Sequence, residues 1–388
     1  MIKTIFPIDI FKHCETPFYY YDLELLKATL REMKSHVKGL PYKVHYAVKA
    51  NANPRILHEI REAGLSIDCV SGGEIVAALA AGFKGDAIAF AGVGKTDREI
   101  ALGINHDIFC FNVESLPELD VINEIAATKG KKVNVALRVN PNIDAHTHKY
   151  ITTGLSENKF GINLELLDAA VDKALSLPDV NLMGLHFHIG SQLLDFTPYK
   201  MLCERINELQ EHFENRGVSF KIINVGGGLG IDYANPDANP ISDFKGYFDT
   251  FKENLKLRPG QELHFELGRA IVGQCGSLIT RVLYVKNGTT RNFAIVDAGM
   301  TDLIRPALYQ AHHVVQNITS ESVETAKYDI VGPICESSDK FASDESLPET
   351  QRGDLLALRS AGAYGEVMSM QYNCRRLPSS HFQENDKK

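Results

Sequence analysis

The feature that most constrains this chain is an alternation of short apolar runs with amphipathic helical stretches, repeated about eight times. The predicted strands cover residues 44–48, 67–70, 88–90, 108–111, 133–139, 182–188, 222–225 and 263–266. Helical patterns over residues 75–81, 115–129, 166–177, 200–216 and 244–255 supply the crossovers between them. Eight such units are what a (β/α)8 barrel of the TIM type needs, and a doubly wound open α/β sheet is the alternative architecture.

The pattern changes at about residue 275. Short alternating runs over 277–285, 292–296, 327–331 and 355–359 are separated there by glycines and polar turns, which is typical of an all-β domain. A chain of 388 residues is long enough for two such domains. We expect the barrel to span 22–272, the β domain to combine 1–21 with 273–378, and the polar tail over 379–388 to be disordered.

Composition narrows the range of partners. The formal charge of -8 gives no electrostatic reason to bind nucleic acid or an anionic membrane. No apolar run spans a bilayer, and Pro7 and Asp9 interrupt the amino terminus before it could form a signal sequence. The seven cysteines form no CxxC pair, which favours reduced thiols over a disulfide framework or a zinc site. We therefore expect a cytoplasmic protein that acts on a small molecule.

Polar residues stand at the ends of most predicted barrel strands. They are Lys49, Asp68, Arg138, His188, the glycines at 226–228, and Glu266 with Arg269. The carboxyl ends of barrel strands meet at one rim, where barrel enzymes carry their active sites. We therefore expect these side chains to lie close together.

Lys49 ends the first of these strands, and the sequence Asn-Ala-Asn-Pro at 51–54 separates it from the next helix. A lysine in a desolvated pocket is biased toward the neutral amine that attacks carbonyl groups, so one interpretation is a Schiff-base lysine. The other is a strand-end lysine whose ammonium group reaches solvent. The residue alone does not decide between them.

The glycine-rich stretch 226–230 follows the seventh predicted strand. Its backbone N–H groups could converge on a phosphate, and barrel phosphate sites commonly lie after strands seven and eight, where Gly268 and Arg269 would supply the other wall. The stretch could also mark only a tight turn. Glu266 similarly has two interpretations: an internal ion pair with Arg269, or a carboxylate that keeps a pyridine nitrogen protonated.

Two histidines, His186 and His188, share one face of a predicted strand because strand side chains alternate. Paired strand histidines are metal ligands in some barrel hydrolases, so a metal-dependent hydrolase is a rival function. Against it, no further cluster of His and Asp occurs at neighbouring strand ends. Four other histidines lie in polar stretches, where solvated side chains are expected: His146, His148, His312 and His313.

The predicted β domain offers two further candidates. Cys335 precedes Glu336 after a Val-Gly-Pro turn, although a lone cysteine is usually a small buried hydrophobic residue. Arg305 begins the sequence Arg-Pro-Ala-Leu-Tyr, which could be only a surface turn. Taken singly, neither stretch predicts a function.

Taken together, the motifs resemble those of the fold-type III pyridoxal-phosphate decarboxylases, related in fold to alanine racemase. In chain order they are Tyr-Ala-Val-Lys-Ala-Asn at 46–51, His-Phe-His-Ile-Gly-Ser-Gln at 186–192, Gly-Gly-Gly-Leu-Gly at 226–230, Glu-x-Gly-Arg at 266–269, Asp-Ala-Gly-Met at 297–300, Arg-Pro-Ala-Leu-Tyr at 305–309, Gly-Pro-Ile-Cys-Glu-Ser at 332–337 and Gly-Ala-Tyr-Gly at 362–365. The resemblance covers about residues 15 to 376. It is strongest to the members that act on meso-2,6-diaminopimelate.

The resemblance implies pyridoxal 5'-phosphate bound to Lys49 as a Schiff base, with His188 stacked on its ring and Glu266 facing its pyridine nitrogen. The implied phosphate contacts are Ser191, Gly227, Gly228, Gly268, Arg269 and Tyr372. Leu267 stands where the family usually has proline, and the chain lacks the family's customary closing strand after residue 376.

The resemblance also implies a substrate site. Arg269, Arg305 and Tyr309 would clamp a distal carboxylate, and Glu336 would bind the distal ammonium. Tyr372 would also contact the substrate, and Cys335 or Lys49 would donate a proton after carbon dioxide leaves. Cys335 and Glu336 would come from a second subunit, so a homodimer is implied. The expected product is L-lysine, as in the last step of lysine biosynthesis.

Three alternatives to diaminopimelate stay open within the family, namely carboxynorspermidine, ornithine and arginine. A plain diamine acid has no distal carboxylate for Arg305 and Tyr309 to clamp, whereas carboxynorspermidine is not excluded by Lys49. A homologue that binds cofactor without turnover is a non-enzymatic alternative. Retention of Lys49, Cys335 and Glu336 argues against it.

Overall fold

The computed structural model describes residues 6–143 and 159–383. The chain forms two compact units. The barrel unit comprises Leu30–Gly230 and Asp243–Gly268, and the β unit comprises Met1–Thr29, Ile231–Ser242 and Arg269–Lys388. The predicted boundaries at 22 and 272 differ from these by several residues, and Ile231–Ser242 was expected in the barrel. That segment belongs to the β unit because its side chains contact residues there, as described below.

The barrel unit contains a closed ring of eight parallel strands. In chain order they are β2 (Tyr42–Ala47), β3 (Ser66–Cys69), β4 (Ile88–Phe90), β5 (Cys110–Val113), β6 (Val133–Asn140), β8 (Val180–His186), β9 (Ile222–Asn224) and β10 (Glu262–Leu267). Neighbours in sequence pair with one another, β10 pairs with β2, and a pairing of β5 with β6 completes the ring. The predicted (β/α)8 barrel is confirmed, and the open-sheet alternative is wrong.

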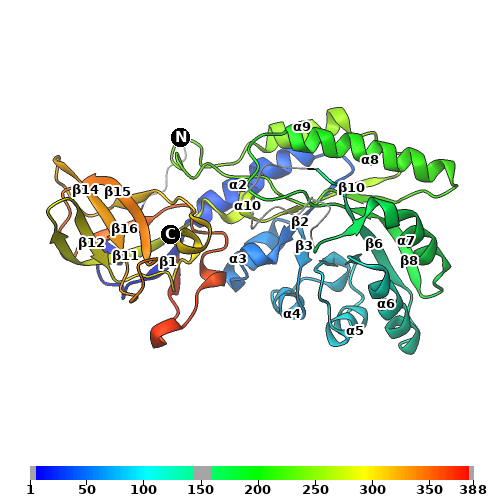
Figure 1. Cartoon of the computed structure of the whole chain (residues 1–388), viewed down its shortest axis with the longest axis horizontal. Helices are drawn as coiled ribbons and strands as arrows, with labels where there is room; N and C mark the ends of the chain where they lie inside the picture. Colours follow the sequence, from blue (N-terminus) through cyan, green and yellow to red (C-terminus); the bar gives the residue numbers. More distant parts are fainter. Residues whose placement is uncertain (1–5, 144–158, 384–388) are drawn as a thin grey trace, which may run out of the picture. The chain divides into compact units, whose positions relative to one another are not determined.

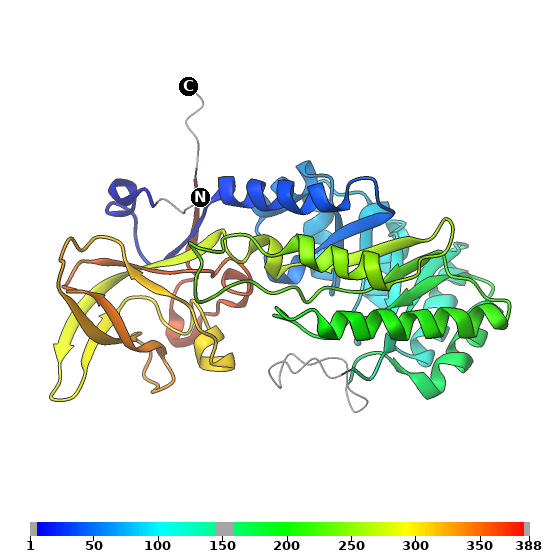
Figure 2. The same cartoon turned by 90° about the horizontal axis from the view of Figure 1, so that it is seen from above.

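Helices follow the strands and cover the outside of the ring (Figure 1). They are α3 (Pro54–Glu62), α4 (Gly72–Ala80), α5 (Asp97–Asn105), α6 (Leu116–Thr128), α7 (Leu164–Ser176), α8 (Thr197–Asn215) and α9 (Phe244–Asn254). Helix α2 (Leu23–Val37) precedes β2, and a short strand β7 (Ile162–Asn163) precedes α7. The long helices α8 and α9 lie side by side (Figure 2). Local sequence sets where helices begin: the Asn53 side chain accepts from Arg55 N, with Pro54 in the first turn.

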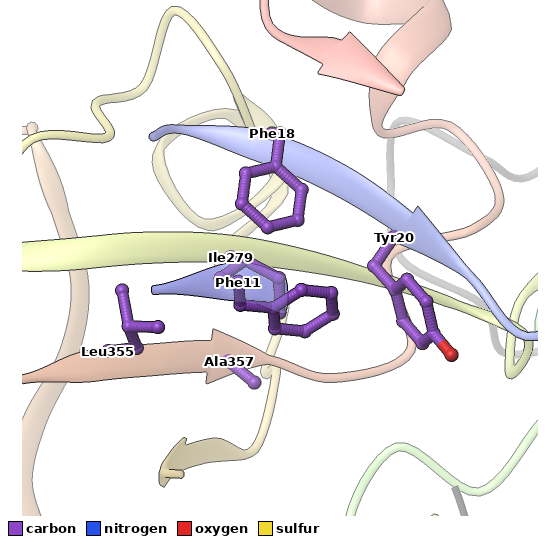
Figure 3. Close-up of a cluster of buried hydrophobic side chains, with 6 residues drawn as sticks. All are labelled: Phe11, Phe18, Tyr20, Ile279, Leu355 and Ala357. Carbon is purple, nitrogen blue, oxygen red and sulfur yellow. The ribbon is translucent and has the colours of Figure 1, made fainter. Parts of the chain in front are cut away.

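The β unit is built on one eight-stranded sheet with the order β13-β16-β11-β12-β14-β15, extended by β1 and β17. The strands are β1 (Phe18–Tyr21), β11 (Gly276–Asn287), β12 (Asn292–Val296), β13 (Val315–Asn317), β14 (Thr325–Val331), β15 (Lys340–Pro348), β16 (Leu355–Leu358) and β17 (Ser379–Phe382). Short helices α1 (Ile8–Phe11), α10 (Arg269–Val272) and α11 (Arg305–Tyr309) accompany them. Figure 3 shows part of its core, where Phe11, Phe18 and Tyr20 pack against aliphatic side chains of β11 and β16.

The carboxyl-terminal tail corrects two predictions. Residues 379–382 were expected to be disordered and the closing strand to be missing, yet they form β17, which pairs in parallel with β1. The pairing is reinforced by ring contacts, with Phe18 and His381 centroids 4.6 Å apart and Tyr21 and Phe382 centroids 5.3 Å apart. The partner strand lies more than 350 residues away in sequence, so local polarity gave no sign of it.

The composition led to expectations about the cysteines and about membrane-spanning segments. All seven cysteines are free thiols. Across residues 6–143 and 159–383, no helix combines the length and the apolar character that a membrane crossing requires.

Candidate active site

Lys49 lies just beyond β2, in a 3-10 turn over Val48–Ala50. Its Nζ is 3.6 Å from Oδ2 of Asp68, which is fully buried at the end of the neighbouring strand β3, while 38% of the lysine side chain is exposed. Burial raises the pKa of Asp68, and the Glu266 carboxylate raises it further, whereas the Lys49 ammonium lowers it. Lys49 is therefore a partly exposed lysine that lies beside a buried acid at the rim.

Glu266 is the most densely hydrogen-bonded acid of the rim. Its Oε1 accepts from Asn112 Nδ2 at 3.1 Å and from Asn224 Nδ2 at 2.8 Å, and its Oε2 lies 3.2 Å from His186 Nε2. Burial opposes its ionisation, but His186 and the Lys49 ammonium hold the pKa of Glu266 far below its ordinary value. Glu266 is thus a buried carboxylate that stays charged.

Asn112 and Asn224 were not singled out from the sequence. Each is a buried amide within a barrel strand, at the third position of β5 and the last position of β9 respectively. A polar amide in an otherwise apolar buried strand needs a hydrogen-bond partner, and that was the available signal. The identity of the partner depended on the closure of the ring.

The two histidines of the His-Phe-His motif do different things. His186 is the last residue of β8 and contacts Glu266, whereas His188 lies beyond the strand end, where its Nδ1 accepts from Gly227 N at 3.3 Å. That acceptor role requires an unprotonated Nδ1. Burial, followed by the Arg138 and Lys49 cations, lowers the pKa of His188 well below its ordinary value, so the ring is neutral.

Gly227 and Gly228 of the glycine-rich loop lie too close to their neighbours to carry a side chain. A Cβ at Gly227 would collide with the Glu266 carbonyl oxygen, and one at Gly228, whose φ is +107°, would lie 2.6 Å from Gly190 O. Gly228 O also accepts from Leu193 N at 2.9 Å, so the loop adjoins the turn that contains Ser191. At Gly268, a Cβ would lie 2.9 Å from Ala50 Cβ, in the turn that carries Lys49. The predicted phosphate contacts of the barrel unit are thus neighbours.

In the β unit, Arg269 and Arg305 are 7% and 5% exposed and share one aromatic neighbour, Tyr233. Arg269 Nη1 donates to the Tyr233 hydroxyl at 2.6 Å, and the Arg305 guanidinium carbon lies 5.4 Å from the Tyr233 ring centroid. Arg269 also faces the Tyr364 ring at 4.9 Å. Tyr309, at the end of α11, contributes to the electrostatic environment of both arginines.

His313 corrects a prediction. His312 is exposed as expected, but His313 is buried, with Nδ1 2.8 Å from Arg359 O and Nε2 accepting from Arg305 Nε at 3.3 Å. The sequence around it is polar, so only tertiary packing against Arg305 revealed its environment. His146 and His148 lie outside the described residues.

Cys335, Glu336 and Tyr372 form a separate exposed group on the β unit. A hydrogen bond from the Tyr372 phenol to the Glu336 carboxylate raises the pKa of Tyr372. The nearby Cys335 raises this pKa further. Ser338 Oγ lies 3.3 Å from Glu336 Oε2. The predicted proton donor Cys335 and the predicted substrate-binding residues Glu336 and Tyr372 therefore lie together on one surface.

A lysine, a glutamate with a lowered pKa and a glycine-lined loop at a barrel rim are features of a class of cofactor-dependent barrel enzymes. The chain belongs to the pyridoxal-dependent decarboxylase family, whose pyridoxal binding domain matches residues 23–273. A curated relative, the diaminopimelate decarboxylase of Bacteroides thetaiotaomicron, is 61% identical over 381 residues and 98% of each chain is covered.

Solved structures agree with this placement. Diaminopimelate decarboxylase from Helicobacter pylori complexed with L-lysine matches with a TM-score of 0.92 at 40% identity, covering 97% of this chain and 94% of that one. The enzyme of the same name from M. jannaschii, in co-complex with L-lysine, has a TM-score of 0.90 at 34% identity, covering 97% and 89% of the two chains. The expected barrel with an added β domain is thus the fold of this family.

Proposed function

We propose that this chain uses pyridoxal 5'-phosphate to decarboxylate meso-2,6-diaminopimelate to L-lysine and carbon dioxide, as the last step of lysine biosynthesis. The observation that carries the proposal is 61% identity to a diaminopimelate decarboxylase over 98% of both chains. The site described above is chemically suited to that reaction. We further propose that the enzyme is a cytoplasmic homodimer.

The residues of the barrel unit fit the cofactor. Glu266 uses three hydrogen-bonding positions of the roughly four on a carboxylate, which leaves one for a protonated pyridine nitrogen. Gly227 and Gly228 present backbone without side chains, as close approach to a phosphate requires. When bound to Lys49 through its aldehyde, pyridoxal phosphate supplies an electron sink for the bond that breaks.

Each barrel residue has a proposed task at a stated atom. Lys49 Nζ would provide the amine that holds the cofactor aldehyde. Asp68 Oδ2, 3.6 Å from that nitrogen, keeps it positioned. Glu266, whose pKa is held below its ordinary value, would face the pyridine nitrogen and would favour its protonated form. His188 offers a neutral ring for stacking, and Ser191 and Gly268 complete the phosphate contacts.

The β unit would bind the rest of the substrate. Arg269, Arg305 and Tyr309 receive the distal carboxylate, which L-lysine retains after the reaction. Glu336 and Tyr372 receive the distal ammonium group, and Tyr372 also touches the cofactor phosphate. The thiol of Cys335, exposed beside them, donates the proton that replaces carbon dioxide.

Product analysis tests the reaction. Purified protein is incubated with pyridoxal phosphate and, in separate reactions, meso-2,6-diaminopimelate, ornithine or carboxynorspermidine, and the amine formed is identified by mass spectrometry. L-Lysine from the first and no putrescine from the second is the expected result. Putrescine as the main product, or turnover of carboxynorspermidine in preference to both, would reassign the substrate.

Subunit complementation tests the homodimer. Lys49→Ala and Cys335→Ala would each be inactive alone, because each removes one member of every active site. A mixture that is unfolded and refolded together would recover up to about a quarter of wild-type activity if each site takes Lys49 from one subunit and Cys335 from the other. No recovery, together with a monomeric mass by analytical ultracentrifugation, would argue against a shared site.

A further inference from the structure

We propose that Tyr233 and His313 are specificity-determining residues, which hold Arg269 and Arg305 as one receptor for the substrate's second carboxylate. The inference rests on the proposed function, since it concerns how a substrate with two amino-acid ends is distinguished from a plain diamine. Every residue involved belongs to the β unit, so its geometry is internal to that unit.

The receptor begins with two buried cations. Arg305 is 5% exposed, and within the described part of the chain no carboxylate comes within ion-pair distance of it. Burial lowers the pKa of Arg305, and the positive charge of Arg269 contributes to the same shift. Guanidinium groups nevertheless stay charged in proteins. A buried cation without a protein acid beside it is energetically costly, so an anionic ligand would be favoured here.

Tyr233 joins the two cations without neutralising them. Its hydroxyl accepts from Arg269 Nη1 at 2.6 Å, while the face of its ring lies 5.4 Å from the Arg305 guanidinium carbon. A cation over an aromatic face is stabilised by the ring quadrupole, and the hydrogen-bond donors at the edge of the guanidinium are not consumed by it. A carboxylate in this position would have occupied donors of Arg305 and cancelled its charge. Tyr233 therefore positions both arginines and leaves Arg305 able to bind an anion.

His313 fixes the other side of Arg305. Because Nδ1 faces the Arg359 carbonyl oxygen at 2.8 Å, that nitrogen carries the proton, and Nε2 is the acceptor for Arg305 Nε at 3.3 Å. Burial lowers the pKa of His313 to about 3, and Arg305 adds to the shift, so the ring stays a neutral acceptor. The Tyr233 ring also packs against this imidazole, with centroids 5.3 Å apart and the two planes at 82° to each other. Like Tyr233, His313 orients Arg305 without contributing a negative charge.

The placement of Tyr233 in the chain links this receptor to the glycine-rich loop. Tyr233 lies in Ile231–Ser242, which directly follows Gly230 in sequence and is part of the β unit. The same segment supplies Asp237, whose Oδ1 is 3.0 Å from Arg359 Nη2, and the Arg359 carbonyl in turn holds His313. One segment thus supports both sides of Arg305. We therefore expect substitutions in Ile231–Ser242 to change how strongly the enzyme prefers a substrate with a second carboxylate.

The test compares two ligands that differ by one carboxylate, L-lysine and 1,5-diaminopentane, as inhibitors of the loaded enzyme. The variants are Tyr233→Phe, which keeps the ring and removes the acceptor, and His313→Leu, which removes the acceptor for Arg305. A hydrogen bond to a charged group corresponds to about a tenfold to hundredfold change in binding. We expect the KM for meso-2,6-diaminopimelate and the inhibition constant of L-lysine to rise by about that factor.

The same variants should leave kcat within about threefold of wild type, because the distal carboxylate is bound equally well in the ground state and the transition state. They should not alter inhibition by 1,5-diaminopentane, which has no carboxylate. His313→Gln, whose amide can accept from Arg305 and donate to Arg359 O, should restore most of the lost affinity. Tyr328→Phe is the matched control, since that buried tyrosine of β14 donates no hydrogen bond to the arginines and accepts from Thr350 N.

Two results would overturn the inference. One is an unchanged KM in folded Tyr233→Phe and His313→Leu, and the other is an equal loss of affinity for both inhibitors, which would indicate a general structural defect. Circular dichroism and thermal melting establish that the variants are folded. Failure of the wild-type protein to form lysine is a different outcome, because it would overturn the proposed function itself.

Discussion

The two units of this protein bury charge in opposite ways. In the barrel unit, Glu266 is a carboxylate ringed by hydrogen-bond donors from three strands, namely Asn112, His186 and Asn224. In the β unit, Arg269 and Arg305 are cations lined by tyrosine rings and, for Arg305, by a neutral imidazole. The first arrangement stabilises the charge within the protein. The second orients the charge, and in our proposal the anion that pairs with Arg305 is supplied by a ligand.

Burying a charge costs free energy at both sites, and the two sites offset that cost in different ways. A charge that must persist in every state of the reaction is best satisfied by fixed dipoles, which need no rearrangement. A charge that must recognise a ligand loses specificity if a protein acid neutralises it beforehand. Aromatic faces stabilise a guanidinium more weakly than a carboxylate does, so they preserve its affinity for an incoming carboxylate.

The largest effect is expected at Lys49, whose ammonium group lowers the pKa of Glu266. Lys49→Ala removes the only amine proposed to hold the cofactor, so turnover should fall below detection and the absorbance near the visible edge should disappear. Spectrophotometry with added pyridoxal phosphate and a carbon dioxide release assay make the measurement. Full turnover with an unchanged spectrum would end the assignment of the barrel rim as the active site.

Glu266→Gln tests whether the reaction requires the negative charge of Glu266 or only a side chain of that size and shape. The amide is nearly isosteric but neutral, so kcat should fall by about a hundredfold or more, as when one fixed charge at a reacting centre is removed. Glu262→Gln, at the start of the same strand and part-exposed, is the control and should change kcat little. Equal activity of the two variants would show that the charge of Glu266 has no role in the reaction.

The barrel unit also buries two imidazole rings in their neutral form. These rings predict how the stability of the protein changes as the pH falls. His45 Nε2 and His264 Nδ1 are 2.9 Å apart, and His264 lies on the same face of β10 as Glu266. Burial lowers the pKa of His45 from 6.5 to about 4 and that of His264 to about 3. The unfolded chain therefore binds protons first as the pH falls below about 6.5, which favours unfolding.

We expect the free energy of unfolding to decrease between about pH 6.5 and pH 4 by about 2–3 kcal/mol for each of these histidines. His45→Gln should make this decrease shallower, as measured by urea denaturation at a series of pH values. His212→Gln, in which an exposed histidine is replaced, is the control and should keep the wild-type slope. The same slope in wild type and His45→Gln would contradict the assignment.

The smallest effect is expected at Tyr364, whose ring faces Arg269 at 4.9 Å. If the aromatic face is what matters, Tyr364→Phe should leave the KM for meso-2,6-diaminopimelate unchanged, and Tyr364→Leu should raise it by about twofold to thirtyfold. Steady-state kinetics measure both. A larger loss in Tyr364→Phe than in Tyr364→Leu would mean that the hydroxyl, and not the ring, supports Arg269.

The sequence predicted the barrel well because each of its strands is followed by its own helix. All eight strands and five of the helices between them were identified from local patterns, with shifts of a few residues at their ends, whereas α3 and α5 were not predicted with bounds. The β unit was less predictable, since its pairings join distant segments. Strand β17 pairs with β1, and Ile231–Ser242 leaves the barrel unit, and neither fact is encoded in a local pattern.

By itself, the sequence determined the fold class, the family and the identity of the rim residues, because hydrophobic periodicity and ordered motifs are local properties of the chain. Only the tertiary structure decided which groups surround each charge. Asn112, Asn224 and His186 meet at Glu266, and Tyr233 and His313 meet at Arg305, across separations of 8 to 154 residues. Hydrogen bonds and cation–π contacts act over a few ångströms in space, so their partners become known only when the chain is folded.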